Sequence, residues 1–294
     1  MPAVSRVGIV AKHHLRQAAP HLTDISAWLR QRGLHPVFEA ATAALCGPLD
    51  AEWTVRNKED LVTEVDMVLV LGGDGTLLGM ADRIGESGLT IPILGVNFGS
   101  LGFLTEVTLP ELYTALESAV TGRASIEERL MLRATTIRGR EVFGTHIALN
   151  DVVFTKTARS RLIDLSVWVD DEFLTHVKGD GLIVATPTGS TAYNLASGGP
   201  IVQPSVDALV VTPIAPHTLT HRPIVIPSSS EVRVEPQMED RDEVFVTFDG
   251  QAGYELKPGD QVKVCRAALP LRLVRPSTRS YFEVLREKLK WGDR

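Results

Sequence analysis

The hydrophobic pattern of this 294-residue chain changes about 130 residues from its start. Up to that point, short apolar runs rich in β-branched residues alternate with stretches of helical periodicity. Such alternation is typical of βαβ units, whose parallel sheet is buried on both faces. We therefore expect an α/β domain at the N-terminus. The pattern predicts strands over residues 7–11, 36–39, 67–71 and 91–96, and helices over residues 18–32 and 77–84.

Beyond about Arg133 the apolar runs become short and closely spaced. Turn signals such as Asp170-Asp171, Asp249-Gly250 and Pro258-Gly259-Asp260 separate several of them, as between the strands of an antiparallel sheet. An all-β domain is therefore expected to follow the α/β domain. Its strands are predicted over residues 143–149, 152–155, 162–169, 173–177, 182–186, 208–212, 224–226, 232–235, 244–248 and 262–265.

The end of the chain returns to a helical pattern over residues 277–291, with Tyr281, Leu285 and Leu289 spaced by four residues. We expect this helix to pack back on the first domain. The predicted organisation is an α/β domain over residues 1–130, an all-β domain over residues 131–275 and a helical tail over residues 276–294.

Charge and cysteine content exclude several classes of partner. A formal net charge of −6 leaves no broad basic surface for a nucleic-acid backbone, although local N–H groups can still hold a nucleotide. Cys46 and Cys265 are the only cysteines, so neither a disulfide framework nor a thiolate zinc site is expected. No apolar run has the length of a signal-peptide core or of the roughly 20-residue membrane span. We therefore expect a soluble, cytoplasmic protein.

A glycine-rich turn, Gly72-Gly73-Asp74-Gly75-Thr76, separates a predicted strand from a predicted helix. Unpaired N–H groups and the helix dipole favour a phosphate at such a junction. A carboxylate beside a phosphate would repel it, so the presence of Asp74 suggests a function. Asp74 either accepts a proton from an attacking hydroxyl or orients a magnesium ion on the phosphates. The alternative is a turn in which Asp74 only caps the helix.

Polar residues follow two further apolar runs. The turn at residues 97–103 lies at the same carboxyl edge of the sheet, where Phe98 either lines an aromatic wall or belongs to the core. Asn150-Asp151 offers amide and carboxylate groups to ribose hydroxyls, or forms an Asx turn. Lys12 and His13-His14 directly follow the first predicted strand. They either contact phosphate or form a solvated loop.

The stretch from residue 178 to residue 194 ends a buried strand in four hydroxyl residues, Thr186, Thr188, Ser190 and Thr191, followed by Tyr193. This combination suits a phosphate or sugar beside an aromatic face. Helix capping accounts for one such hydroxyl, which favours a binding role for the group. His217 and His221 are four residues apart, but nearby prolines argue against a helix that presents both to zinc.

Along nearly its whole length the sequence resembles the NAD kinase family. The glycine turn alone resembles a motif that is also found in diacylglycerol kinases, sphingosine kinases and phosphofructokinases. The block of residues 179–194, with residues 198–200, is far more specific to the NAD kinase family. The matching segments are residues 72–76, 97–103, 150–151, 179–194, 198–200, 213–217, 249–251 and 285–292.

The resemblance implies transfer of the γ-phosphoryl group of ATP to the 2′-hydroxyl of the adenosine ribose of NAD, which gives NADP and requires Mg2+. It also implies an α/β domain followed by a β-sandwich, with catalysis in the cleft between them, and a homodimer or homotetramer. Inorganic polyphosphate as donor, NADH as acceptor and feedback by NADP or NADPH all stay open.

The resemblance also implies roles for individual residues. Asp74 would be the general base, and Asn150 and Asp151 would hold ribose hydroxyls. Asp180 would reach the nicotinamide end, either within one subunit or across a subunit contact. Asp151 stands where many members have Glu, and Lys178 where members differ and NADH acceptance is decided. The implied NAD-binding residues are Gly75, Thr76, Phe98, Asn150, Asp151, Lys178, Asp180, Thr188, Thr191, Ala192, Tyr193, Ala215 and Gln251. The implied phosphate- and ATP-binding residues are Lys12, Gly72, Gly73, Gly75 and Thr76, and Mg2+ would arrive on the nucleotide phosphates instead of binding a side-chain cluster.

Two other functions fit parts of the sequence. A lipid or sphingoid-base kinase would share the glycine turn, but the chain lacks an exposed apolar helix or a basic amphipathic face for a membrane surface. A nucleotide-binding regulator without turnover would share the pocket, but binding alone would be eased by removing the negative charge of Asp74 from a phosphate site.

Overall fold

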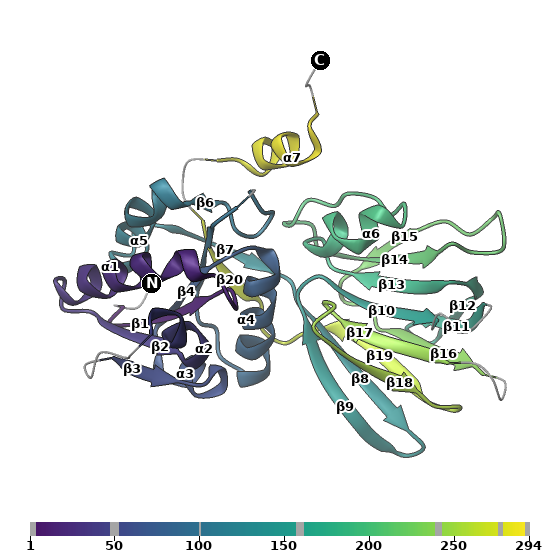
Figure 1. The fold of residues 1–294 in the computed structure, drawn as a ribbon. Coiled ribbons are helices and arrows are strands. Elements are labelled where there is room, and N and C mark those ends of the chain that lie inside the picture. Colours follow the sequence, from purple (N-terminus) through teal and green to yellow (C-terminus); the bar gives the residue numbers. More distant parts are fainter. Residues whose placement is uncertain are drawn as a thin grey trace. The chain divides into compact units, whose positions relative to one another are not determined.

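The computed structural model describes residues 4–47, 53–99, 101–156, 162–238, 243–275 and 279–291. The chain divides into two compact units, each with its own core (Figure 1). Unit 1 comprises Met1–Glu128 and Leu271–Arg294, and unit 2 comprises Arg129–Pro270.

Unit 1 is built on a sheet whose strands run in the order β3-β2-β1-β4-β5-β20-β7, with β6 beside β5. The run Met67–Leu71 (β4) is buried throughout, as expected for a central parallel strand covered on both faces. The other strands are β1 (Arg6–Ala11), β2 (His35–Glu39), β3 (Thr54–Arg56), β5 (Ile93–Asn97), β6 (Val107–Thr108), β7 (Ser125–Arg129) and β20 (Leu271–Arg275).

Helices cover both faces of this sheet (Figure 1). Apolar residues of α1 (Ala19–Arg30) and α5 (Leu112–Val120) join the core on one face. On the other face, Gly8 lies against Leu61 of α3 (Lys58–Glu64), and Gly95 lies against Leu77 of α4 (Asp74–Ser87). Shorter elements are α2 (Ala40–Ala43), η1 (Arg16–Ala18), η2 (Ala44–Cys46) and η3 (Leu109–Glu111).

The strand order of unit 1 reverses between β1 and β4. The chain moves outward from β1 through β2 to β3, and then returns to pair β4 with the other side of β1. In open α/β sheets ligands bind outside the carboxyl ends of the strands at such a reversal. Lys12 directly follows β1 and Gly72 directly follows β4, so both stand at this point.

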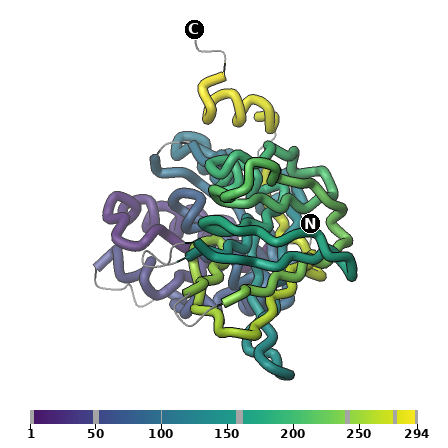
Figure 2. The backbone as a smooth tube through the Cα atoms, turned by 90° about the vertical axis from the view of Figure 1, so that its right-hand side faces the viewer, coloured from purple at the N-terminus to yellow at the C-terminus, as the bar shows by residue number. Residues whose placement is uncertain are grey.

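Unit 2 consists of two antiparallel sheets, seen from two directions in Figures 1 and 2. Buried residues of both sheets, such as Phe154 and Val184 on one and Leu165 and Val234 on the other, form one core between them. The predicted fold class, an α/β domain with a parallel sheet followed by an all-β sandwich domain, is therefore confirmed.

The strands of unit 2 fall into two sets. One sheet has the order β15-β14-β13-β10-β17-β18, with β10 (Asp151–Lys156), β13 (Gly181–Ala185), β14 (Ala208–Ile214), β15 (Ile224–Pro227), β17 (Val244–Phe248) and β18 (Ala252–Leu256). The other has the order β12-β11-β16-β19-β8-β9, with β8 (Leu132–Arg138), β9 (Glu141–Ala148), β11 (Ile163–Val169), β12 (Glu172–Gly179), β16 (Val232–Gln237) and β19 (Gln261–Arg266). Two short helices, η4 (Gly189–Thr191) and α6 (Tyr193–Ala196), follow β13.

The structure differs from the sequence expectation at β20. Residues 271–275 were grouped with the all-β domain, yet Leu273 pairs in parallel with Ile93 of β5 in unit 1. The alternating Leu-Arg-Leu-Val-Arg sequence has the appearance of a half-buried antiparallel strand, and nothing local in it tells which sheet it joins.

The predicted C-terminal helix is α7 (Tyr281–Leu289), which belongs to unit 1. Ser280 and Glu283 form a capping box at its start, and Val284 and Leu285 are buried. Just before the helix, Arg279 donates to the Glu106 carbonyl (2.9 Å) and pairs with Glu111 (3.3 Å). The predicted packing of the tail on the first domain is confirmed.

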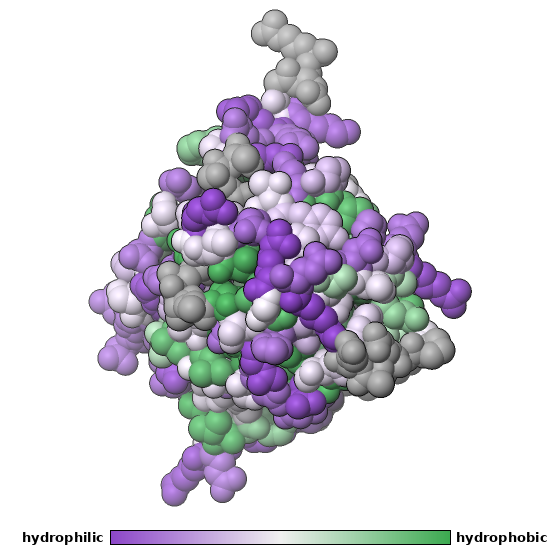
Figure 3. Space-filling view, turned by 90° about the vertical axis from the view of Figure 1, so that its left-hand side faces the viewer, coloured by the Kyte–Doolittle hydropathy of each residue, from purple (hydrophilic) through white to green (hydrophobic). Residues whose placement is uncertain are grey.

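Neither the face in Figure 3 nor the described helices have the features of a membrane-spanning segment. On the side of the molecule seen in Figure 3, polar and apolar residues are interspersed. Within the described ranges, no helix combines the length and the apolar character that crossing a bilayer requires.

Candidate active site

The glycine turn and the exit of the first strand meet at the reversal of the sheet in unit 1. The Lys12 N–H donates to the Leu71 carbonyl and the Gly72 N–H to the Val96 carbonyl, both at 2.9 Å. A Cβ at Gly72 would lie 2.7 Å from Thr76 Oγ1 and 3.1 Å from Lys12 Cβ, so only glycine fits there. The structure thus brings Lys12, Gly72 and Thr76 together at the N-terminus of α4.

The Asp74 carboxylate makes contacts that neither sequence hypothesis foresaw. Its Oδ2 accepts the Phe103 N–H (2.9 Å). Its Oδ1 accepts the Leu104 N–H (3.1 Å), the Thr105 N–H (3.0 Å) and the Thr105 hydroxyl (2.9 Å). The cap of α4 is Gly73, without a side-chain hydrogen bond. Asp74 therefore does not cap its own helix, and instead joins the glycine turn to the turn after β5.

The turn after β5 is shaped around this carboxylate. A Cβ on Gly102 would overlap Asp74 Oδ1 and Thr105 Oγ1, so the turn needs glycine at this position. Asn97 donates its side-chain amide to Thr105 Oγ1 (3.1 Å) and accepts the Gly99 N–H (2.5 Å). Asn97, Thr105 and Asp74 consequently form one hydrogen-bonded chain. Sequence reasoning missed the part of Thr105, because its partner lies 31 positions away.

Phe98 lies in the same turn and was expected to contact NAD. Its partly buried ring meets the ring of His21 edge to face, with centroids 5.6 Å apart. It also packs against the core of unit 1. These contacts agree with the core alternative, and its contact with NAD stays a prediction.

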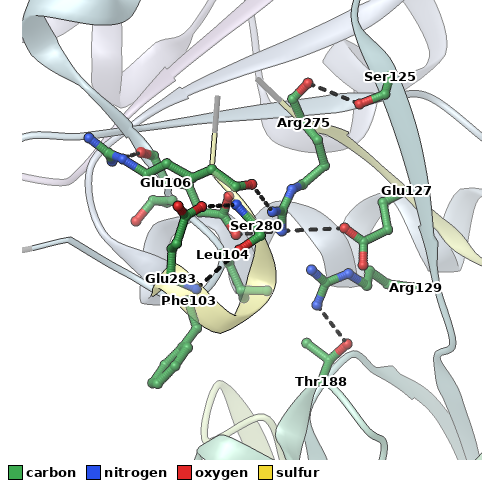
Figure 4. Close-up of polar contacts among 12 residues, drawn as sticks. Phe103, Leu104, Glu106, Ser125, Glu127, Arg129, Thr188, Arg275, Ser280 and Glu283 are labelled. Carbon is green, nitrogen blue, oxygen red and sulfur yellow. Dashed lines mark hydrogen bonds and ion pairs between the residues drawn. The ribbon is translucent and has the colours of Figure 1, made fainter. Parts of the chain in front are cut away.

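A buried ion pair follows this turn directly. Glu106 and Arg275 of β20 approach to 2.5 Å, with side chains only 3% and 10% exposed. Arg275 also pairs with Glu127 at 3.3 Å, so it lies between two carboxylates (Figure 4). Because the Arg279 side chain donates to the Glu106 carbonyl, the turn is tied both to the last strand and to the segment before α7.

In unit 2 the carboxylate of Asp249 holds the backbone of Asn150-Asp151. It accepts the N–H groups of Leu149 (2.6 Å), Asn150 (2.7 Å) and Asp151 (2.9 Å). On the other side, Thr186 donates its N–H to the Asn150 carbonyl (2.9 Å) and its hydroxyl to the Leu149 carbonyl (2.6 Å). The backbone of this turn is therefore fixed from two directions.

Asp151 is only 5% exposed and lies near Asp249. Burial and the charge of Asp249 together raise the pKa of Asp151 to about 7. Burial also raises the pKa of Asp249, although its three N–H donors act against that rise. Near neutral pH, the ionised form of Asp151 can therefore accept a hydrogen bond from a hydroxyl, and its protonated form can donate one to it.

The hydroxyl cluster after β13 corrects part of the sequence argument. Ser190 donates to the Pro187 carbonyl (2.6 Å) and accepts the Val202 N–H (2.9 Å). Thr188 accepts from Arg129 (3.3 Å; Figure 4), and Thr191 donates to the Thr188 carbonyl (3.3 Å). Contacts within unit 2 thus engage these hydroxyls as they do that of Thr186, so their number alone is no evidence for a ligand. Tyr193 is 44% exposed, and its ring is accessible.

The predicted NAD-binding residues of unit 2 form two groups at opposite ends of β13. Asp151 pairs with Ala185 at one end of β13. The segment that follows this end contains Thr188, Thr191, Ala192 and Tyr193, and the exposed Gln251 lies in the turn between β17 and β18 on the same side. Lys178, Asp180 and Ala215 belong to the other end, where Gly181 pairs with Ile214. Five residues of extended strand separate the ends by about 13 Å.

At that second end, the Asp180 carboxylate pairs with Lys156 at 2.7 Å. The His217 N–H donates to the Lys178 carbonyl (2.8 Å), and the Asp180 N–H to the Ile214 carbonyl (2.9 Å). Ala215 has a φ of 42°, a left-handed conformation that is strained for a residue with a Cβ. The structure therefore brings Lys178, Asp180 and Ala215 together on one corner of unit 2.

Within the described parts of the chain, no group of three or more His, Cys, Asp or Glu side chains could hold a metal ion. Asp74 has both carboxylate oxygens engaged by N–H or O–H donors.

Comparison with known proteins gives concordant matches. Residues 7–124 match the model of the ATP-NAD kinase N-terminal domain, and residues 149–276 match that of the ATP-NAD kinase C-terminal domain. The chain is 50% identical to the NAD kinase of Geobacter sulfurreducens over 291 residues, which is 99% of this chain and all of that protein. The NAD kinase of Geotalea daltonii is 46% identical over 292 residues, with the same shares covered.

Solved structures show the same fold. Yeast NADH kinase, in complex with NADH, superposes with a TM-score of 0.90 at 25% identity and covers 100% of this chain and 89% of its own. An NAD kinase from Archaeoglobus fulgidus, in complex with ATP, gives a TM-score of 0.74 at 24% identity and covers 96% of this chain and 99% of its own. With the family models matched in both halves of the sequence, these similarities show that the chain belongs to the NAD kinase family of enzymes.

Proposed function

We propose that this enzyme transfers the γ-phosphoryl group of ATP to the 2′-hydroxyl of the adenosine ribose of NAD and so forms NADP. The observation that carries this proposal is the position of Asp74. Its carboxylate stands at the N-terminus of α4, next to the reversal of the parallel sheet, where phosphates bind. The relatives named NAD kinase support NAD as the acceptor, and the Archaeoglobus fulgidus structure that holds ATP supports ATP as the donor.

The donor phosphates would lie on the glycine turn. We propose that the backbone of Gly72, Gly73 and Gly75, the Thr76 hydroxyl and the Lys12 ammonium group contact them. Mg2+ fits as part of the nucleotide, because phosphate oxygens are the hard ligands that it prefers and the described residues provide no carboxylate cluster for it. When bound there, it would neutralise charge on the transferred phosphoryl group.

Asp74 is proposed as the general base. Among the described residues, Oδ2 receives the Phe103 N–H alone, so a lone pair of this oxygen remains for the hydroxyl proton. The three donors at Oδ1 would hold the carboxylate in place during transfer. In a loose phosphoryl-transfer transition state, this alignment lowers the barrier in addition to proton removal.

NAD would be selected by unit 2. We propose that Asn150 and Asp151 bind ribose hydroxyls, and that the exposed ring of Tyr193 stacks on the adenine beside Ala192. Such stacking suits a ring of which a large part is exposed. Thr188, Thr191 and Gln251 would complete this part of the site, while Thr76, Gly75 and Phe98 of unit 1 would contact the same NAD molecule.

The second group, Lys178, Asp180 and Ala215, is proposed to act through a second copy of the chain. Its separation from Asp151 by the length of β13 supports this view, because a homodimer or homotetramer can bring Asp180 of one copy to the nicotinamide end of NAD bound to another. A reducing cytoplasm is the proposed location, in which Cys46 and Cys265 are free thiols.

A coupled assay tests this function. Purified protein is mixed with ATP, Mg2+ and NAD, and NADP is read through an NADP-specific dehydrogenase. We expect NADP to form only when all three are present. Tight NAD binding without product would support a regulator instead, and phosphorylation of a sphingoid base without NADP would support a lipid kinase. Replacing ATP with inorganic polyphosphate, and NAD with NADH, identifies the donor and the acceptor range.

A further inference from the structure

Asp249 does more than begin a turn. The sequence places it in an Asp-Gly hairpin between β17 and β18, and its φ of 51° fits that turn. Its side chain, however, makes contacts outside the hairpin. The carboxylate accepts hydrogen bonds from three consecutive N–H groups about 100 positions earlier in the sequence. We propose that Asp249 is a positioning residue that holds the Asn150-Asp151 turn in the conformation that presents both side chains to NAD.

The three N–H groups need this acceptor because of where the chain runs. Residues 149–150 connect β9 of one sheet to β10 of the other, so they leave one ladder before the next begins. Backbone N–H groups at such a crossing lose their strand partners, and an unpaired buried N–H is costly. One ionised carboxylate can accept all three, which an amide or a hydroxyl cannot do equally well.

The opposite side of the turn is also fixed. Thr186 donates to the carbonyls of Leu149 and Asn150, and a Cβ on Gly189 would overlap the Asn150 backbone. The Asp249 N–H donates in turn to the Asp151 carbonyl at 3.0 Å. Among the described residues, these contacts use the backbone of the turn, which leaves the Asn150 and Asp151 side chains available for a ligand.

Asp249 also sets the charge around Asp151. After burial itself, the negative charge of Asp249 is the cause of the raised pKa of Asp151. The strand on the other side of β10 places the uncharged Ala185 opposite Asp151. Removal of the charge at position 249 would therefore lower the pKa of Asp151, because a carboxyl group ionises more easily when a neighbouring negative charge is lost.

The variant Asp249→Asn tests the positioning role, which rests on the proposed function. The Asn side chain keeps the size of Asp and one acceptor oxygen, but its NH2 group would face N–H donors of the turn that a carboxylate oxygen now accepts. We expect the KM for NAD to rise at least about tenfold, while the KM for ATP changes less than about twofold. The pH-dependent limb of kcat/KM for NAD that belongs to Asp151 should also move to lower pH, an effect that a merely structural role would not produce.

Asp170→Asn is the matched control. Asp170 also begins a hairpin with a positive φ (54°), and its carboxylate also accepts a backbone N–H, that of Glu231 at 2.9 Å. It lies in the other sheet, between β11 and β12, and holds none of the proposed NAD-binding residues. We expect its KM values and pH profile to match the wild-type enzyme.

Asp249→Glu keeps the measurement informative if Asp249→Asn fails to fold, as thermal unfolding would show. It retains the charge but lengthens the side chain, so the KM for NAD should rise while the pH limb stays near that of the wild type. A folded Asp249 variant with the wild-type KM for NAD, or an equal rise in Asp170→Asn, would overturn the inference. Absence of NADP formation by the wild-type enzyme would instead remove the proposed function, and this inference with it.

Discussion

The Asp74 carboxylate has a structural role beside the catalytic one that we propose. The sequence leaves three roles open for Asp74, which are those of a proton acceptor, a magnesium ligand and a helix cap. The structure shows a carboxylate that joins two turns through four hydrogen bonds. A base held in this way is oriented before substrate binds, which lowers the reorganisation that the reaction requires.

We predict that Asp74→Asn lowers kcat by at least about 100-fold while NAD still binds, since an amide cannot take up the hydroxyl proton. Stopped assays give kcat, and isothermal titration calorimetry gives the affinity for NAD. Thr105→Val is the comparison, because it removes one donor to Asp74 and leaves the carboxylate, so its kcat should fall by less than about tenfold. Near-normal turnover in Asp74→Asn would exclude Asp74 as the base.

Gly102 offers a test of the same carboxylate from outside. The methyl group of Gly102→Ala would overlap Asp74 Oδ1 and displace it, so we expect kcat to fall at least about tenfold. Gly99→Ala is the control in the same turn, because among the described residues apart from its chain neighbours the nearest atom to its new Cβ would be Asn97 Oδ1 at 3.7 Å. Equal kcat values in the two variants would contradict this account of the turn.

At the scale of the element, β20 returns the chain to unit 1, and its Arg275 meets Glu106 in a buried ion pair. We predict that Glu106→Gln lowers the free energy of unfolding by about 2 kcal/mol, because it removes the closer and more buried of the two carboxylates at Arg275 and leaves only Glu127. Urea denaturation measures the change. Glu86→Gln, which breaks an exposed pair with Arg83, should cost less than about 1 kcal/mol. Similar losses in both variants would show that burial of the pair is not what matters.

The elements also show what a sequence can and cannot predict. The apolar run of β4 predicts a buried strand by itself, because a strand buried on both faces is apolar throughout. Short strands such as β18 (Ala252–Leu256) were missed, because its glycine and polar residues give no clear alternation. The glycine turn was recognised locally, whereas the contacts of Asp249 and Glu106 join positions about 100 and 169 apart and leave no local signal.

At the scale of the whole molecule, the raised pKa of Asp151 links stability to pH. Because folding raises this pKa from 3.8 to about 7, the folded state binds the proton more tightly and loses stability as pH rises through this window. We predict that Asp151→Asn, which cannot ionise, becomes progressively more stable than the wild type from about pH 4 to about pH 7, by a few kcal/mol at most. Thermal unfolding at several pH values measures this, and a constant difference would contradict it.

Two units with separate cores divide the work that we propose, since unit 1 provides the phosphate turn and Asp74, and unit 2 provides the residues that select NAD. The most direct test is to follow the reaction of ATP, Mg2+ and NAD by 31P nuclear magnetic resonance with the purified enzyme. We predict equal amounts of ADP and of a product whose new phosphate is a monoester on the 2′-oxygen of the adenosine ribose. A phosphate at any other position, or ATP hydrolysis without a phosphorylated dinucleotide, would contradict the account.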